Sequence, residues 1–220
     1  MKKNEKRLLL VGCILVLGFL VWTALIQTVD VEPMGQNGTD IGFATFNSLF
    51  HKLTGVHMTL YTITDWLGLI PVFVCMTFGG IGLIQVFQRK SIFKVDLDII
   101  FLGIYYVIVV SAYLIFEMIP INYRPILIEG FMEASYPSST TLLVLSVMPT
   151  LNFQVNQRIK NTPVRKIICI MTSIISVFMV MGRLVSGVHW VTDIAGSIML
   201  SFGIFYIYKA VVLLCKKEEK

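Results

Sequence analysis

The residues best suited to chemistry lie in the C-terminal third of this 220-residue chain. His189 and Asp193 are four positions apart, and Arg183 stands six residues before the histidine. On a helix, a spacing of four places His189 and Asp193 on one face. We therefore expect the aspartate to hold one imidazole nitrogen and leave the other free. A histidine oriented in this way is a competent nucleophile, and a guanidinium binds phosphate oxygens in pairs. The pattern indicates phosphate chemistry; an Arg–Asp ion pair beside an interfacial histidine is the alternative.

A second group of candidates precedes and opens a later hydrophobic segment. Arg124 is followed by a proline, which stiffens the chain beside it. The stretch 137–141 reads Pro-Ser-Ser-Thr-Thr, in which Ser138 is a candidate N-cap and the first helical amides can bind an anion. Taken singly, the arginine would be a surface residue and the serine only a cap. Charged residues at the edges of segments that otherwise exclude charge nevertheless indicate a function.

Composition places the chain in a membrane. Hydrophobic residues make up 56% of it, the mean hydropathy is +0.80, and uninterrupted apolar runs reach spanning length. The net charge of +5 would suggest nucleic acid in a soluble protein. Here the basic residues stand in short clusters between apolar runs, as in topology signals. We therefore expect the bilayer, and no nucleic acid, as a partner.

The pattern predicts an all-α polytopic membrane protein, with residues 1–220 forming a single domain of six transmembrane helices plus an interfacial helix in the first outer loop. Apolar residues recur at helical spacing around 46–53, which predicts that interfacial helix; a lid packed on the bundle is the alternative. The fourth span is short and contains Pro149, so we expect a helix shielded by its neighbours with a recessed outer end. The six spans are expected at 8–26, 66–87, 97–119, 138–153, 167–185 and 191–214.

Charge placement supports this count. With six spans the basic clusters all fall on one side, which the positive-inside rule makes cytoplasmic. Both termini are then cytoplasmic, and the candidate site faces the outside of the cell membrane. Only Lys52, Arg124 and Arg183 lie away from that side. The clusters are Lys2, Lys3, Lys6 and Arg7; Arg89, Lys90 and Lys94; Arg158, Lys160, Arg165 and Lys166; and Lys216, Lys217 and Lys220.

In this order the motifs resemble the type 2 phosphatidic acid phosphatase superfamily, in its membrane lipid phosphatase branch. The family's third motif is Ser-Arg, five residues, His, three residues, Asp; it matches in Arg183, His189 and Asp193, with Gly182 replacing the serine. The first is Lys, six residues, Arg-Pro, and the second is Pro-Ser-Gly-His. The resemblance implies that all three motifs meet at the outer end of a six-helix core.

The first two motifs are degenerate. Glu117 stands where the family has lysine, and Arg124 matches. Ser138 matches in the second motif, but Ser139 replaces its glycine and Thr140 its histidine, which protonates the leaving group in the family. Losing a general acid typically costs about a hundredfold to ten-thousandfold in rate. We expect Glu117 to lie near the pocket, paired with one of the two arginines.

The resemblance implies a membrane lipid phosphatase that hydrolyses a lipid phosphate or polyprenyl diphosphate through a phosphohistidine intermediate. A diphosphate leaving group is a weak base and suffers less from a missing acid. The alternative is a non-catalytic member that binds or transports a lipid phosphate, which Glu117 and Thr140 favour. No metal and no cofactor is expected. In the enzyme His189 would attack and Asp193 would orient it, while the phosphate would be bound by Arg124, Ser138, Ser139 and Arg183.

Overall fold

The computed structural model describes residues 3–218, with side chains to residue 216, and within this range it is helical throughout apart from connecting loops and isolated bridges. The helices are α1 (Lys3–Ile26), α2 (Ala44–Thr54), α3 (Met58–Leu67), α4 (Leu69–Arg89), α5 (Leu97–Met118), α6 (Ser139–Arg158), α7 (Thr162–Val185) and α8 (Val191–Glu218), with 3₁₀ turns η1 (Gln36–Gly38) and η2 (Ile92–Lys94).

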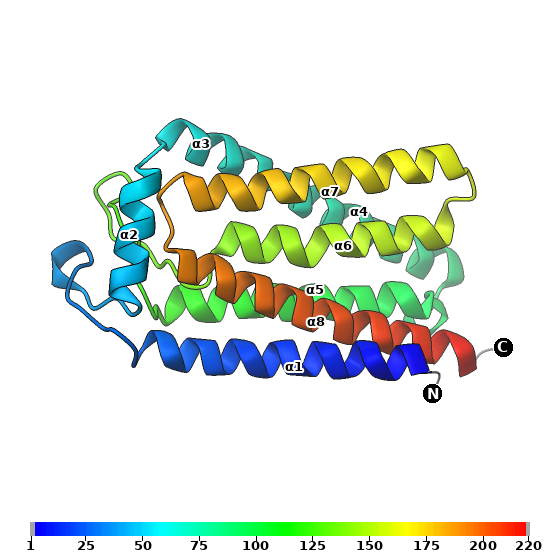
Figure 1. The fold of residues 1–220 in the computed structure, drawn as a ribbon. Coiled ribbons are helices and arrows are strands. Elements are labelled where there is room, and N and C mark those ends of the chain that lie inside the picture. The colour runs from blue at the N-terminus through cyan, green and yellow to red at the C-terminus, as the bar shows by residue number, and fades with distance from the viewer. Residues whose placement is uncertain (1–2, 219–220) are drawn as a thin grey trace.

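The long helices run lengthwise beside one another (Figure 1). α8 packs along α1 and also against α6, and α6 is flanked on its other sides by α7, α4 and α5. Both chain ends emerge at one end of the bundle, which we call the terminal end. The opposite end, called the loop end, carries α2 and the α5–α6 and α7–α8 connections. The fold thus separates two ends of different character.

Five helical segments are long and apolar enough to cross a membrane. They are Lys3–Ile26, Met58–Arg89, Leu97–Met118, Thr162–Val185 and Val191–Lys216, and they correspond to five of the six predicted spans. The chain is therefore a multi-pass membrane protein, and the count of six spans stays a prediction.

The fourth predicted segment forms α6, which differs from the prediction in length. The helix has 20 residues and continues to Arg158 rather than ending at 153. At ~1.5 Å per residue it reaches about 30 Å, so it is not a short helix. Its polar C-terminal part stays helical within the bundle because Gln154 is buried and donates to the Tyr208 hydroxyl at 3.2 Å. Pro149 lies inside the helix, as expected.

The second apolar segment begins earlier than predicted. The additional helix α3 joins α4 through Gly68, whose N–H donates to the carbonyls of Thr64 at 3.1 Å and Asp65 at 2.9 Å. A Cβ on Gly68 would stand 2.8 Å from the Asp65 oxygen, so the junction favours glycine. This junction brings α3 over the end of α7.

The helix predicted around 46–53 is present as α2, and its polar face is turned inward. Asn47 is buried and donates to the Gly42 carbonyl at 2.9 Å and the Thr192 hydroxyl at 3.0 Å. Phe46, Leu49 and Leu53 are exposed on the opposite face. α2 therefore packs on the bundle as a lid would, while presenting an apolar outer face; its placement in the membrane interface stays a prediction.

The basic clusters that follow α4, follow α6 and precede α7 all lie at the terminal end, together with those of α1 and α8 (Figure 1). Lys2, Lys220 and the side chain of Lys217 belong to the predicted clusters but lie outside the described residues. One-sided clustering predicts that the terminal end faces the cytoplasm.

Single-cysteine labelling tests this orientation. In a background with serine at 13, 75, 169 and 215, we expect Phe131→Cys at the loop end to react with a membrane-impermeant maleimide in intact cells. Phe93→Cys at the terminal end should react only after permeabilisation. Both side chains are exposed, so accessibility depends on the membrane alone. The reverse labelling pattern would refute the predicted orientation.

Candidate active site

The connection between α7 and α8 places His189 at the loop end. α8 begins at Val191, so the histidine precedes the helix. The Trp190 N–H donates to Asp193 Oδ2 at 2.8 Å, and the Asp193 N–H donates to the Trp190 carbonyl at 3.1 Å. This reciprocal pairing is a capping interaction. His189 and Asp193 meet as predicted, but through a helix cap rather than along one helix face.

The imidazole of His189 is held at Nδ1. Nδ1 lies 3.6 Å from Asp193 Oδ2, 3.2 Å from the Ser135 hydroxyl and 3.2 Å from the Ser135 carbonyl. The Ser135 hydroxyl in turn donates to Asp193 Oδ2. Because a carbonyl and a carboxylate only accept hydrogen bonds, this environment favours the tautomer with its proton on Nδ1. The lone pair then lies on Nε2.

The histidine is neutral around pH 7. Burial lowers the pKa of His189 to about 4; Asp193 opposes this shift, whereas the positive charges of Arg124 and Arg183 add to it. A neutral imidazole with a free Nε2 is the form that a nucleophile requires.

Arg183 is the most deeply buried cation of the described chain, with 1% of its surface exposed. Its Nη2 donates to Asp65 Oδ1 at 2.6 Å and to the Thr140 hydroxyl at 2.7 Å. The guanidinium carbon lies 4.6 Å from the centre of the Tyr61 ring. These contacts from α3 and α6 offset the cost of burying the charge.

Arg124 approaches the same ring from the α5–α6 connection, with its guanidinium carbon 5.6 Å from the Tyr61 centroid. Its Nη2 lies 3.1 Å from Glu133 Oε2, and its Nε donates to the Ala134 carbonyl at 3.4 Å. An antiparallel backbone pairing fixes this partner, since the Arg124 N–H donates to the Glu133 carbonyl at 3.1 Å. The two motif arginines therefore share one aromatic ring.

Several buried polar atoms in this cluster have no hydrogen-bond partner within the described residues. They are Nε2 of His189, Oδ1 of Asp193, Nη1 of Arg124, and Nε and Nη1 of Arg183. Unpaired buried polar atoms are costly, so their concentration in one place indicates a ligand. Guanidinium donors beside an imidazole nitrogen suit an oxyanion such as phosphate.

Ser138 and Ser139 mark the start of α6. Ser138 is the N-cap, as predicted, but its hydroxyl donates to Thr141 Oγ1 at 3.1 Å and not to a helical amide. Its carbonyl accepts from the Ser197 hydroxyl at 3.0 Å, which ties α6 to α8. Ser139 lines a small cavity together with Glu117. Contact of either serine with phosphate stays a prediction.

The expected ion pair of Glu117 is not formed. Its carboxylate is exposed at the end of α5 and has no cation within 4.0 Å among the described side chains. Glu133 holds Arg124 and Asp65 holds Arg183 instead. The backbone pairing around Arg124 explains the difference, because it sets Glu133 directly against the guanidinium.

Four site residues were missed by the sequence reasoning: Tyr61, Asp65, Glu133 and Ser135. Asp65 could have been identified from the sequence. A carboxylate beside a spanning segment needs an ion-pair partner, just as an arginine does. Ser135 stands two residues before the second motif, but nothing in its type distinguishes it from a capping residue. Tyr61 lies in a helix that was not predicted.

The buried histidine predicts a pH dependence of stability. Its folded pKa of about 4 lies below the ordinary value of 6.5. Between these values the unfolded chain binds more protons, so this contribution to stability is lost as the pH falls from about 6.5 to 4. We expect His189→Gln to flatten the fall of the melting temperature in detergent over this range, with His57→Gln, an exposed histidine, as control. Identical pH profiles for His189→Gln and wild type would contradict a buried neutral imidazole.

Part of the chain matches a known protein family, and the fold is similar to that of a solved structure. Residues 113–216 match the model of the PAP2 superfamily. No curated protein matches in sequence. A solved structure described as the first transmembrane PAP2 type phosphatidylglycerolphosphate phosphatase from Bacillus subtilis is similar, with a TM-score of 0.65 and 19% identity over 92% of this chain and 96% of that one. At that identity the likeness concerns the fold. The matched region, which contains the histidine, its aspartate and both motif arginines, is therefore similar to the PAP2 superfamily.

Proposed function

We propose that this protein is a membrane lipid phosphatase that hydrolyses a lipid phosphate or polyprenyl diphosphate at the outer face of the cell membrane. The observation that carries the proposal is the state of His189. Its Nδ1 is held by Ser135 and Asp193, while its Nε2 is buried without a partner among the described residues, beside two arginines. The match of residues 113–216 to the PAP2 superfamily supports phosphatase activity, and the apolar helices support a lipid substrate.

In the proposed mechanism Nε2 of His189 attacks phosphorus. The Nε2–P bond forms as the bond from phosphorus to the leaving oxygen breaks, and the histidine becomes a phosphohistidine. Arg124 and Arg183 bind the phosphoryl oxygens and stabilise their developing charge. Asp193 stabilises the positive charge that the ring acquires. Water then attacks phosphorus, which returns the electron pair to Nε2 and releases phosphate.

The threonine at position 140 affects which class of substrate the site can hydrolyse. Its hydroxyl accepts the hydrogen bond from Arg183 Nη2, so threonine positions the arginine instead of supplying an acid. A monoester leaves as an alkoxide and depends strongly on protonation, whereas a diphosphate leaves as a phosphate and depends on it less. The site therefore favours a diphosphate lipid over a monoester.

A non-catalytic role in binding or transporting a lipid phosphate is the second candidate. Thr140 at the position of the family's acid favours it. The held tautomer of His189 favours the enzyme, because binding an anion does not require an oriented neutral nucleophile.

Phosphate release by the purified protein distinguishes the two. The panel contains polyprenyl diphosphates, phosphatidic acid and phosphatidylglycerolphosphate, the compound after which the Bacillus subtilis phosphatase is named.

We expect His189→Ala to lower turnover by at least about a thousandfold, and Asp193→Asn to lower it severely while the protein stays folded. His57→Ala is the matched control, because the ring of His57 bonds the Thr54 carbonyl at 2.8 Å and lies outside the cluster. Activity that survives His189→Ala would eliminate the phosphohistidine mechanism; saturable binding without turnover would establish the second candidate.

Substitutions at Thr140 test the substrate preference. Thr140→His restores an acid and should raise the rate on monoesters more than on diphosphates. Thr140→Val removes the oxygen that holds Arg183 and should raise KM about tenfold for both classes, as expected for a lost hydrogen bond to a charged group. Equal acceleration of both classes by Thr140→His would argue against the leaving-group explanation.

A further inference from the structure

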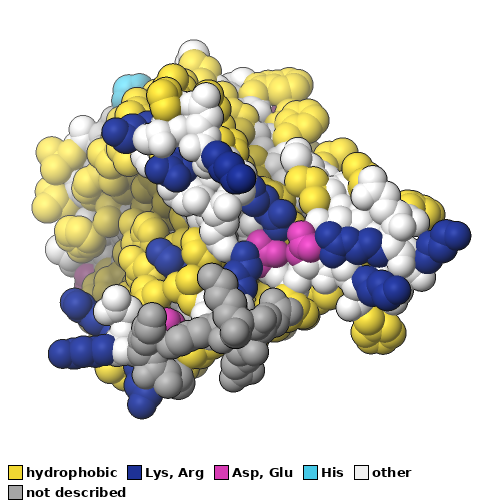
Figure 2. Space-filling view, turned by 90° about the vertical axis from the view of Figure 1, so that its right-hand side faces the viewer, with side chains coloured by type: hydrophobic (Ala, Val, Ile, Leu, Met, Phe, Trp, Pro, Cys, Tyr) yellow, Lys and Arg dark blue, Asp and Glu magenta, His cyan; other side chains and the backbone are white. Residues whose placement is uncertain are grey.

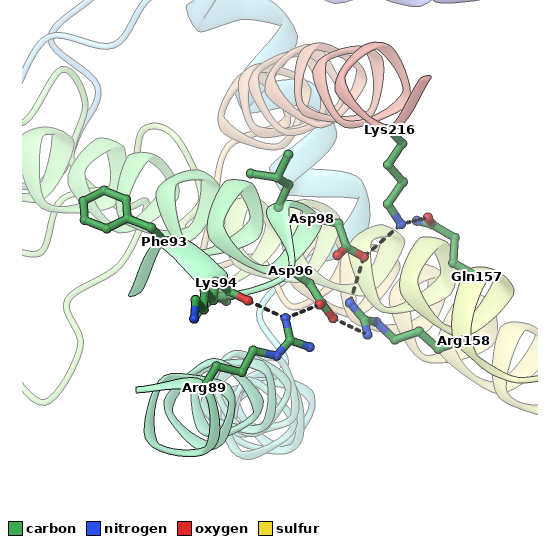
Figure 3. Close-up of a pocket in the computed structure, with 10 residues that line it drawn as sticks. Arg89, Phe93, Lys94, Asp96, Asp98, Gln157, Arg158 and Lys216 are labelled. Atoms are coloured by element: carbon green, nitrogen blue, oxygen red, sulfur yellow. Dashed lines mark hydrogen bonds and ion pairs between the residues drawn. The ribbon is translucent and has the colours of Figure 1, made fainter. Parts of the chain in front are cut away.

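A second polar centre lies at the terminal end, remote from the histidine. A cavity of about 520 Å³ opens there between α4, η2, α5, α6 and α8 (Figure 3). Its charged lining consists of Arg89, Lys94, Asp96, Asp98, Arg158 and Lys216. These residues come from five different elements and the turn between two of them, so the fold assembles the site rather than any local run of charge.

Two carboxylates hold three of the cations in place. Asp98 is buried and lies 2.8 Å from Arg158 Nη2 and 3.1 Å from Lys216 Nζ. Asp96 lies 2.8 Å from Arg89 Nη1 and 3.5 Å from Arg158 Nη1. Figure 3 shows these side chains meeting around the two aspartates. The network fixes the positions of the cations without neutralising them all.

The lining keeps a positive excess, because it carries four cations and two carboxylates. Lys94 has no carboxylate within 4.0 Å among the described side chains, and Arg89 and Lys216 remain partly exposed. Figure 2 views this end directly and shows lysines and arginines spread over it, with two adjacent acidic side chains near the middle. A preformed, partly open basic cavity suits a phosphate group.

Exposed apolar side chains adjoin the cavity and favour a phosphate carried by a lipid. Phe93 is 92% exposed and Ile92 is 61% exposed, both in the η2 turn next to Lys94. Exposed apolar residues adjoining lysine and arginine at the end of a spanning bundle are typical of the membrane interface. A free anion would have no use for them, whereas a phospholipid offers both a headgroup and acyl chains.

We propose that this cavity binds the headgroup phosphate of an anionic phospholipid from the bilayer leaflet at the terminal end. Lys94 and Arg89 contact the phosphate, Lys216 and Arg158 frame it, and Phe93 inserts beside the acyl chains. Basic pockets between transmembrane helices bind anionic lipids in this manner. The site is independent of the proposed hydrolysis at the loop end.

Lipid binding to the purified full-length protein in detergent tests the proposal. The probes are phosphatidylglycerol, phosphatidylcholine and inorganic phosphate, with binding followed by native mass spectrometry and by melting temperature. We expect saturable binding of phosphatidylglycerol in preference to phosphatidylcholine. Lys94→Gln should weaken it about fivefold, the effect of one cation near a membrane surface. Phe93→Ser should weaken lipid binding as well.

Lys160→Gln is the matched control, since Lys160 is exposed on the α6–α7 connection and does not line the cavity. It should bind phosphatidylglycerol as the wild type does. If Lys160→Gln weakened phosphatidylglycerol binding as much as Lys94→Gln, the binding would depend on general surface charge, and the proposed site would be overturned. Tight inorganic phosphate binding, lost in Lys94→Gln but unaffected by Phe93→Ser, would overturn the lipid as its source. Because phosphatidylglycerol binding is measured without turnover, an inactive protein would leave this result intact.

Discussion

The burial of Arg183 is the constraint on which the loop end depends. A guanidinium cannot lose its charge, so placing it among apolar helices requires partners that replace its hydration. Asp65 and Thr140 supply oxygens from α3 and α6, and Tyr61 supplies an aromatic face. These three partners come from two helices that must therefore converge on the end of α7. The bend at Gly68, which carries α3 over α7, follows from the same requirement.

At the terminal end a buried charge is also stabilised by partners, but there the buried charge is negative. There the buried charge is the carboxylate of Asp98, and Arg158 and Lys216 are its partners from α6 and α8. α6 thus contacts a buried charge near each of its ends, through the Thr140 hydroxyl that accepts from Arg183 and through the Arg158–Asp98 ion pair. A helix bonded at both ends is held in register along the bundle axis. This explains how α6, predicted as the fourth span, is held in the bundle although it is not among the five segments apolar enough to cross a membrane.

The sequence allowed the helical class, the membrane setting and the core of the site to be predicted, because each rests on local pattern. Contact between His189 and Asp193 was predicted for the wrong local reason, since a helix cap joins them. The partners of the arginines were out of reach for a different reason. Asp65 lies 118 positions from Arg183, so only the assembled bundle reveals their pairing. Glu133 was hidden by a backbone pairing within a connection that had no predicted structure.

The two degenerate motif positions have different physical consequences. At Thr140 the hydroxyl still serves the site, because it holds Arg183, and what is lost is the capacity to protonate. The Glu117 carboxylate stands outside the ionic cluster. It therefore does not repel a phosphate bound by the two arginines at contact distance. In the proposed mechanism the remaining groups orient the nucleophile and stabilise phosphoryl charge. Under that proposal, catalysis depends on a leaving group that departs as a stable anion, and a diphosphate meets that condition through its own chemistry.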